Sequence, residues 1–153
     1  MTVRTDILLH FERPSVHNLA NQLVSSAPER LALVVDDHPI NRLLMQALLS
    51  KAGWATALAE SAADAIAVLT SGLRADVIFM DIRMPDVDGY AATSQIRHWE
   101  GLTGHDRTPI IALSADVLDE TRIRALAVGM DGFLAKPLSL ENLSATLAGF
   151  TKS

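Results

Sequence analysis

The feature that most constrains the fold of this chain is the alternation of five short apolar runs with longer segments of helical spacing. From Leu31 onward, such alternation favours a repeated unit of one strand and one helix, which builds a parallel sheet. Each apolar run also ends at a polar turn, so the expected strands are short. The predicted strands are Leu31–Val35, Ala55–Ala59, Asp76–Met80, Ile110–Leu113 and Gly132–Ala135.

The segments between these strands carry signals for helix starts and ends. Pro39 suits the first turn of a helix, and Gly53 suits its end. The inward face of that helix is predicted to consist of Ile40, Leu43, Leu44, Ala47 and Leu48. The other predicted elements are a second helix from the N-cap Ser61, a third after Gly89, a polar loop over Gly101–Thr108, a fourth helix within Asp116–Val128 and a fifth from near Ser139.

Length and composition limit the classes of protein to consider. The 153 residues suit one domain, and 49% hydrophobic with only 5% aromatic residues suits a core of aliphatic side chains. A net charge of −5 argues against direct binding of nucleic acid. The absence of cysteine excludes disulfides and thiolate metal sites. No segment has the apolar length of a membrane span or the pattern of a signal peptide, so a cytoplasmic location is expected.

Three regions are expected along the chain. Residues 1–30 form an extension or linker, residues 31–150 form the domain, and residues 151–153 form a tail. Ser15 is a candidate cap for a short amphipathic helix in the extension. That helix either belongs to a linker or packs on a partner, including a second copy in a homodimer.

Acidic, hydroxyl and basic residues lie at the ends of four of the five predicted strands. They are Asp36 with Asp37, Asp81, Ser114 and Lys136. Because parallel strands deliver their carboxyl ends to one edge of the sheet, these residues should meet in one pocket. Taken alone, the Asp36 and Asp37 pair is typical of a solvated turn ahead of a helix. Together, three carboxylates suit a hard cation such as Mg²⁺, and a lysine with a hydroxyl suits a phosphoryl group beside it.

Four segments together resemble the signature segments of response regulator receiver domains of two-component signalling. They are Val34-Val-Asp-Asp-His38, Met80-Asp-Ile-Arg-Met-Pro-Asp-Val-Asp-Gly89, Ile110-Ile-Ala-Leu-Ser-Ala115 and Phe133-Leu-Ala-Lys-Pro137. The resemblance extends from Leu31 to about Phe150. It implies an α/β fold of the flavodoxin-like (βα)5 type, with strand order 2-1-3-4-5.

The resemblance assigns the phosphoryl chemistry to Asp81, the expected phospho-acceptor that attacks the phosphorus of a partner's phosphohistidine. Asp37 and Asp81 would ligate Mg²⁺ directly, with Asp36 acting through water and the Arg83 backbone carbonyl adding an oxygen. Lys136 would pair with the phosphoryl oxygens. Because Mg²⁺ keeps several waters, so few protein ligands suffice.

The same resemblance implies a conformational switch. Ser114 would turn its hydroxyl toward the new phosphoryl group, and Phe133 would move inward as it does so. A cis peptide bond between Lys136 and Pro137 is expected to aim the lysine. The changed surface would lie on the fourth helix, fifth strand and fifth helix, as a shift between two packings.

Two neighbours of these residues are expected to modulate the site. Arg83 and Asp116 have opposite charges and should pair across the pocket entrance, which we expect to hinder the attacking water and slow dephosphorylation. His38 is expected to face solvent, because three carboxylates form a hard site that does not favour an imidazole.

Receivers of hybrid histidine kinases are the most similar in the Arg97-His-Trp-Glu100 segment and the following loop. The expected partner is therefore a histidine kinase or a histidine phosphotransfer protein, with no output domain after the fifth helix. The alternatives are a stand-alone regulator and an interaction module that works without phosphorylation. A phosphohydrolase is disfavoured, because the position two after the nucleophile holds Arg83 rather than an acid. Beyond accepting a phosphoryl group and slowly hydrolysing it, no enzymatic activity is expected.

Overall fold

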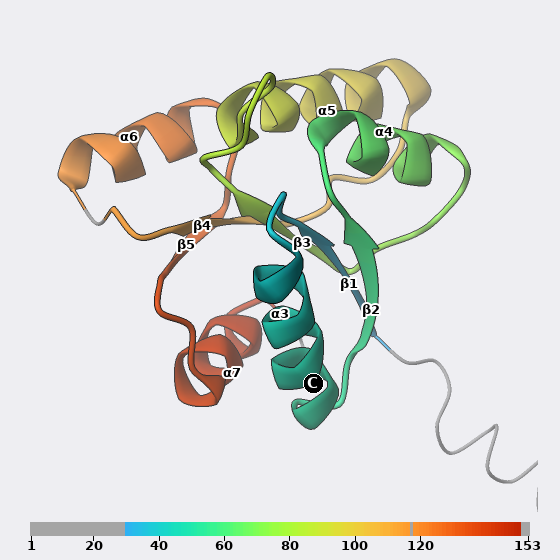
Figure 1. Cartoon of the computed structure of the whole chain (residues 1–153). Coiled ribbons are helices and arrows are strands. Elements are labelled where there is room, and N and C mark those ends of the chain that lie inside the picture. Colours follow the sequence, from blue (N-terminus) through green and yellow to red (C-terminus); the bar gives the residue numbers. More distant parts are fainter. Residues whose placement is uncertain (1–29, 117, 151–153) are drawn as a thin grey trace, which may run out of the picture.

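A parallel sheet lies between two layers of helices in this chain (Figure 1). The computed structural model describes residues 30–116 and 118–150, so the predicted helix from Ser15 and the tail at 151–153 lie outside the described residues. The strand order is β2-β1-β3-β4-β5, in agreement with the expected order. The strands are β1 (Leu31–Val35), β2 (Ala55–Ala59), β3 (Val77–Asp81), β4 (Ile110–Ser114) and β5 (Gly132–Ala135).

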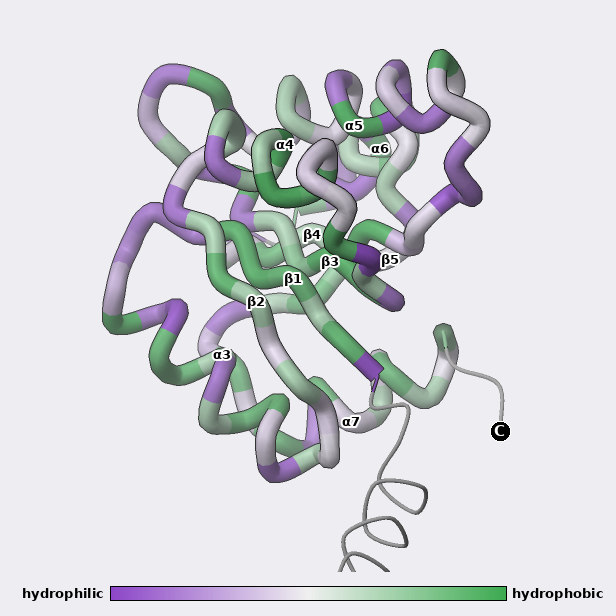
Figure 2. The backbone as a smooth tube through the Cα atoms, turned by 90° about the vertical axis from the view of Figure 1, so that its right-hand side faces the viewer, coloured by the Kyte–Doolittle hydropathy of each residue, from purple (hydrophilic) through white to green (hydrophobic). Residues whose placement is uncertain are grey.

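Helices cover both faces of the sheet, and two apolar clusters fill the space beneath them. One cluster packs α4, α5 and α6 on one face, and the other packs α3 and α7 on the opposite face. The strands form the hydrophobic centre between these layers, as the colouring of β1 and β3 in Figure 2 shows. The helices are α3 (Pro39–Lys51), α4 (Ala62–Thr70), α5 (Gly89–Thr103), α6 (Asp119–Ala127) and α7 (Leu140–Ala148).

Helix starts follow the capping residues. The Ser61 hydroxyl accepts a hydrogen bond from the Asp64 amide at 3.0 Å, and the Ser139 hydroxyl accepts one from the Asn142 amide at 3.1 Å. Each bond satisfies an amide that has no partner within its own helix. The predicted starts of the second and fifth helices are therefore confirmed.

The predicted inward face of α3 is wrong. Ile40, Leu43 and Leu44 are 73%, 59% and 43% exposed, whereas Met45 and Leu49 are fully buried. The sequence is apolar on more than one side of this helix, so periodicity alone did not select the buried side. Packing against the sheet determines which side is buried. The residues predicted to face inward lie largely on the outer side of the helix.

Two strand boundaries also differ from the prediction by one residue. β3 runs Val77–Asp81 rather than Asp76–Met80, because Asp76 lies just before the strand and its carboxylate accepts the Leu31 amide at 2.8 Å. β4 extends past Leu113 to include Ser114. Asp81 and Ser114 are therefore the last residues of neighbouring central strands, and the register pairs Asp81 with Leu113.

The third helix is longer than predicted, so the loop expected over Gly101–Thr108 is wrong in its first part. α5 continues through Thr103 and ends at Gly104, whose φ of 72° suits glycine. Arg97 on this helix donates hydrogen bonds to the Glu100 carboxylate, the Asp131 carboxylate and the Thr108 carbonyl at 2.7–2.8 Å. This network fastens the loop to the amino-terminal edge of the sheet, opposite the edge where the strands end.

Candidate functional site

The structure brings the five predicted polar residues together at the carboxyl ends of the strands. Asp36 and Asp37 follow β1, Asp81 ends β3, Ser114 ends β4 and Lys136 follows β5. A pocket of about 350 Å³ opens at this edge of the sheet. Its lining is formed by His38, Pro39, Ile40, Asn41, Asp81, Arg83, Ser114, Ala115 and Lys136.

Two carboxylates beside Asp81 carry oxygens that accept no hydrogen bond. Asp36 is fully buried, and its Oδ1 accepts the His38 backbone N–H at 2.9 Å. Its Oδ2 accepts no hydrogen bond, and the positively charged Lys136 Nζ lies 3.6 Å from it. Asp37 Oδ1 is likewise buried and accepts no hydrogen bond, although His38 Nδ1 lies 3.1 Å away. Buried oxygens without donors are costly, and a cation between them would remove that cost.

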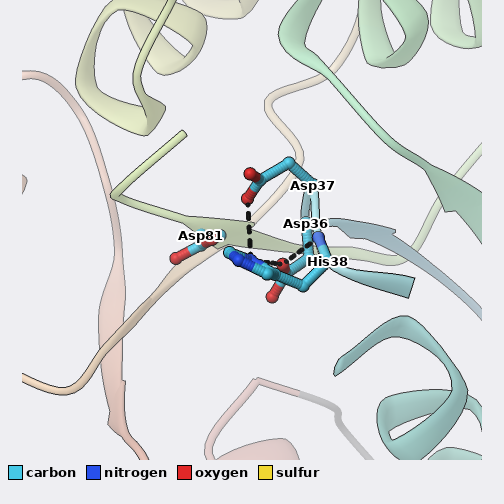
Figure 3. A group of neighbouring side chains, drawn as sticks. All are labelled: Asp36, Asp37, His38 and Asp81. Atoms are coloured by element: carbon cyan, nitrogen blue, oxygen red, sulfur yellow. Dashed lines mark hydrogen bonds and ion pairs between the residues drawn. The ribbon is translucent and has the colours of Figure 1, made fainter. Parts of the chain in front are cut away.

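The charge distribution around Asp81 favours a bound cation. Burial, reinforced by the Asp36 carboxylate, raises the pKa of Asp81 from its ordinary 3.8 to about 6. Lys136 opposes this rise, with Nζ 3.3 Å from Asp81 Oδ1. One ammonium group therefore faces two buried carboxylates. One ligand atom from each of Asp36, Asp37, His38 and Asp81 lies within 4.8 Å of the others. Figure 3 shows these four side chains gathered at the ends of their strands. The three carboxylates among these donors fit a hard divalent cation such as Mg²⁺.

The turn after β3 fixes the position of Asp81. A Cβ atom added to Gly89 would lie 2.3 Å from the Asp81 carbonyl oxygen, so only glycine fits there. The Gly89 amide donates to the Ile82 carbonyl at 2.9 Å, and the Asp88 carboxylate caps α5 by accepting the Ala91 amide. The start of α5 is thereby held directly against the end of the strand that carries Asp81.

Ser114 and Lys136 come from neighbouring strand ends. The Lys136 amide donates to the Ser114 carbonyl at 2.8 Å, and the Lys136 to Pro137 peptide bond is cis. The Ser114 hydroxyl accepts the Asp116 amide at 2.9 Å. The hydroxyl is therefore bonded to the loop after β4, whereas the ammonium group is already directed at Asp81.

Asp116 connects that loop to α6 and to the pocket rim. Its carboxylate accepts hydrogen bonds from the Leu118 amide and the Thr121 hydroxyl, both at 2.9 Å. The bond from the Leu118 amide, followed by that from Thr121, lowers the pKa of Asp116. Arg83 Nη2 lies 3.7 Å from Asp116 Oδ2, and the Arg83 side chain is 80% exposed. The predicted pair is present in the geometry, as a loose contact at the surface.

Phe133 lies apart from the acidic cluster. It is half-buried on β5, and the Arg122 guanidinium sits over its ring at 4.6 Å. The ring lines a separate cavity of about 260 Å³ beside α6. The structure therefore places Phe133 next to the helix that the expected switch would move, rather than at the phosphoryl site.

Sequence reasoning missed several residues that support the site. Arg42 donates to the Asp36 carbonyl at 2.6 Å, and Asn41 reaches Asp36 Oδ1 at 3.5 Å. Tyr90 is buried at the start of α5 with the Arg124 guanidinium 4.1 Å from its ring. The spacing of Asn41 and Arg42, one helical turn after the acidic pair, is a signal that could have identified them.

Comparison with known proteins assigns the family. Residues 32–148 match the model described as the response regulator receiver domain, and the chain belongs to this family. The sensor histidine kinase RcsC of Escherichia coli strain K12 is 39% identical over 127 residues, which cover 83% of this chain. They cover 13% of RcsC, so the chain spans a small part of the length of such relatives.

Solved structures of receiver domains share the fold. The receiver of sensor histidine kinase PA1611 from Pseudomonas aeruginosa PAO1 has a TM-score of 0.69 at 35% identity, covers 80% of this chain and 97% of its own, and has a magnesium ion coordinated in its active-site cleft. The receiver of Ssk1, solved in complex with the histidine phosphotransfer protein Ypd1 of Saccharomyces cerevisiae, has a TM-score of 0.74 at 28% identity and covers 80% of this chain and 89% of the matched chain.

No helix within residues 30–116 and 118–150 combines the length and apolar character that crossing a bilayer requires.

Proposed function

We propose that this receiver domain accepts a phosphoryl group on Asp81 from a partner's phosphohistidine, as one step of a phosphorelay. The observation that carries the proposal is the arrangement around Asp81. Its buried carboxylate lies 3.3 Å from the Lys136 ammonium group, beside two buried acidic oxygens, Asp36 Oδ2 and Asp37 Oδ1, that accept no hydrogen bond. A nucleophile, a cation site and a countercharge for the phosphoryl oxygens are thus within one pocket.

Each side chain has a separate part in this reaction. One Asp81 oxygen forms the new bond to phosphorus while the bond from phosphorus to the partner's histidine nitrogen breaks. Asp37, Asp81 and the Arg83 carbonyl would hold Mg²⁺, with Asp36 acting through water. The cation supplies positive charge for the oxygens of the transferring group. Lys136 offers the same phosphoryl oxygens an ammonium group at the end of β5.

The response to phosphorylation begins at Ser114. In the present arrangement the Ser114 hydroxyl accepts the Asp116 amide at 2.9 Å. To donate its proton to a phosphoryl group on Asp81 the side chain would turn inward, which would take its oxygen away from that amide. Because the Asp116 carboxylate accepts the Thr121 hydroxyl on α6, loss of the bond between Ser114 and Asp116 would release the loop before that helix. The packing of Phe133 against Arg122 would change with it, which alters the surface formed by α6, β5 and α7.

A partner surface adjoins the phosphoryl pocket. Ile40, Leu43 and Leu44 on α3 are exposed, and Ile40 also lines the pocket that contains Asp81. Exposed apolar residues next to a reactive site are typical of a protein interface. We propose that the histidine-bearing helix of a kinase or phosphotransfer protein packs on this face. The Ssk1 receiver, which resembles this chain, is known in complex with such a phosphotransfer protein.

The similarity to RcsC supports a role in the phosphorelay of a hybrid histidine kinase. In that role the domain passes the phosphoryl group onward or restrains the kinase. The alternative is a stand-alone regulator. It would use the same pocket and would differ in the source of the phosphoryl group.

Intact mass spectrometry tests the proposal directly. After incubation with acetyl phosphate and Mg²⁺, the chain should gain one phosphoryl group, about 80 Da. The gain should disappear in EDTA and in Asp81→Asn, and persist in the control Asp86→Asn, which changes an exposed carboxylate in the next turn. A chain that gains no mass from acetyl phosphate or from a phosphorylated phosphotransfer protein would overturn the proposal and favour an interaction module.

A further inference from the structure

We propose that His38 is a metal ligand of the phosphoryl pocket, giving it a strong preference for Zn²⁺, Ni²⁺ and Co²⁺ over Mg²⁺. The inference rests on the cation site of the proposed function and adds a nitrogen donor to it. His38 Nδ1 lies 3.1 Å from Asp37 Oδ1 and 3.6 Å from Asp36 Oδ1. Figure 3 shows the imidazole ring between the Asp37 and Asp36 carboxylates, with its end toward Asp81.

The backbone holds His38 in this place. Its N–H is bonded to Asp36 Oδ1 at 2.9 Å, its carbonyl accepts the Arg42 amide at 3.1 Å, and Pro39 follows. The His38 side chain makes no capping hydrogen bond to α3, although His38 occupies the cap position. Although the His38 side chain is 66% exposed, its Nδ1 lies close to the carboxylates of both Asp36 and Asp37. Exposure leaves the ring room to turn toward a cation without disturbing the core.

The unsatisfied oxygens are the second, independent observation. Asp36 Oδ2 belongs to a fully buried residue and accepts no hydrogen bond. Asp37 Oδ1 is also buried and accepts none, although the Asp37 side chain is 23% exposed. One ligand atom from each of Asp36, Asp37, His38 and Asp81 can be chosen so that all four lie within 4.8 Å of one another. Four donors so close together match the spacing that a four-coordinate ion requires after small side-chain movements.

The chemistry of the donors determines which ions benefit. Mg²⁺ prefers oxygen ligands and keeps much of its water, so an imidazole adds little to its binding. Zn²⁺, Ni²⁺ and Co²⁺ bind imidazole nitrogen well, and their affinities for mixed nitrogen and oxygen sites exceed that for Mg²⁺. His38 should therefore discriminate between the two classes of ion.

Ligation by His38 also has a consequence for phosphorylation. A tetrahedral ion held by four protein ligands keeps no open position for a substrate oxygen. Zn²⁺ held by one ligand atom from each of Asp36, Asp37, Asp81 and His38 would fill the cation site and offer the phosphoryl oxygens no free coordination position. Such an ion is expected to block the pocket, and removal of His38 should relieve this inhibition.

Isothermal titration of the full chain with MgCl₂ and with ZnCl₂ tests the proposal. His38→Asn should weaken Zn²⁺ binding at least about tenfold and leave the Mg²⁺ dissociation constant within about twofold. The control His98→Asn, which changes an exposed histidine on α5, should alter neither. With Co²⁺, the visible absorption of tetrahedral coordination should appear in the parent chain and in His98→Asn, and be lost in His38→Asn.

The two proposals fail in different ways. If His38→Asn binds Zn²⁺ as tightly as the parent while Mg²⁺ still binds, the role of His38 is refuted and the phosphoryl site stands. If the parent chain binds neither ion, the cation site itself is refuted, and the role of His38 with it.

Discussion

Replacing Asp81 by asparagine should stabilise the metal-free domain. Folding raises the pKa of Asp81 from 3.8 to about 6, so the folded state binds the proton more tightly than the unfolded state does. The resulting penalty is absent below pH 3.8, grows as pH rises from 3.8 to about 6, and is complete above pH 6. At about 1.4 kcal/mol for each pKa unit, the ionised carboxylate costs the folded state up to about 3 kcal/mol at pH 7.5.

Urea unfolding in EDTA measures this difference. At pH 7.5, Asp81→Asn should increase the free energy of unfolding by about 2–3 kcal/mol, and the gain should fall toward zero near pH 4. Asp86→Asn, the exposed control, should change it by less than about 0.5 kcal/mol. Adding Mg²⁺ should narrow the gap, because the ion stabilises the parent chain alone. Equal free energies of unfolding for the parent and the variant in EDTA at pH 7.5 would refute the conclusion that the ionised Asp81 carboxylate destabilises the folded domain.

Four further substitutions test other parts of the structure. Arg83→Ala and Asp116→Ala should each speed loss of the phosphoryl group by no more than a few-fold, because an exposed pair contributes only about 0–1 kcal/mol; unchanged rates in a phosphate-release assay would contradict the rim hypothesis. Arg97→Met should lower the free energy of unfolding by about 3 kcal/mol, since it leaves the buried Glu100 carboxylate without its cation, whereas Asp131 keeps Arg107 at 2.7 Å; thermal melts showing no loss would be inconsistent with the network. Gly89→Ala should abolish phosphorylation of Asp81 with acetyl phosphate, because its Cβ collides with the backbone of the acceptor; full labelling by mass would show that the turn can move.

The strands could be predicted from the sequence because polar turn residues mark where they end. The one-residue error at Asp76 arose because its carboxylate bonds a neighbouring strand, a long-range contact that a local pattern does not contain. The prediction of the buried face of α3 was wrong for a related reason. Ile40, Leu43 and Leu44 satisfy helical periodicity as well as Met45 and Leu49 do, and only packing on the sheet separates the two sets.

The members of the site could be predicted, whereas the directions of its side chains could not. The order and spacing of the four motifs predicted that Asp81, Ser114 and Lys136 lie at one edge of the sheet, and the structure places them together there. Their roles stay predictions until the phosphorylation assay is done. The bond from the Asp116 amide to the Ser114 hydroxyl and the position of the His38 ring depend on rotamers, which periodicity and motif spacing do not determine.

The hydrogen bond between the Ser114 hydroxyl and the Asp116 amide would make the proposed switch graded. If Ser114 turns inward, it would lose this neutral bond and donate one to a charged phosphoryl oxygen, and such bonds contribute about 1 and about 1.5–3 kcal/mol respectively. The difference of about 0.5–2 kcal/mol changes the ratio of two states by about 2- to 30-fold. Phosphorylation would therefore shift the equilibrium between the two packings by a bounded factor, and a minority of the unmodified chains would already adopt the active packing. The Thr121 hydroxyl, which donates to Asp116 from α6, would help to hold the packing of the unmodified chain.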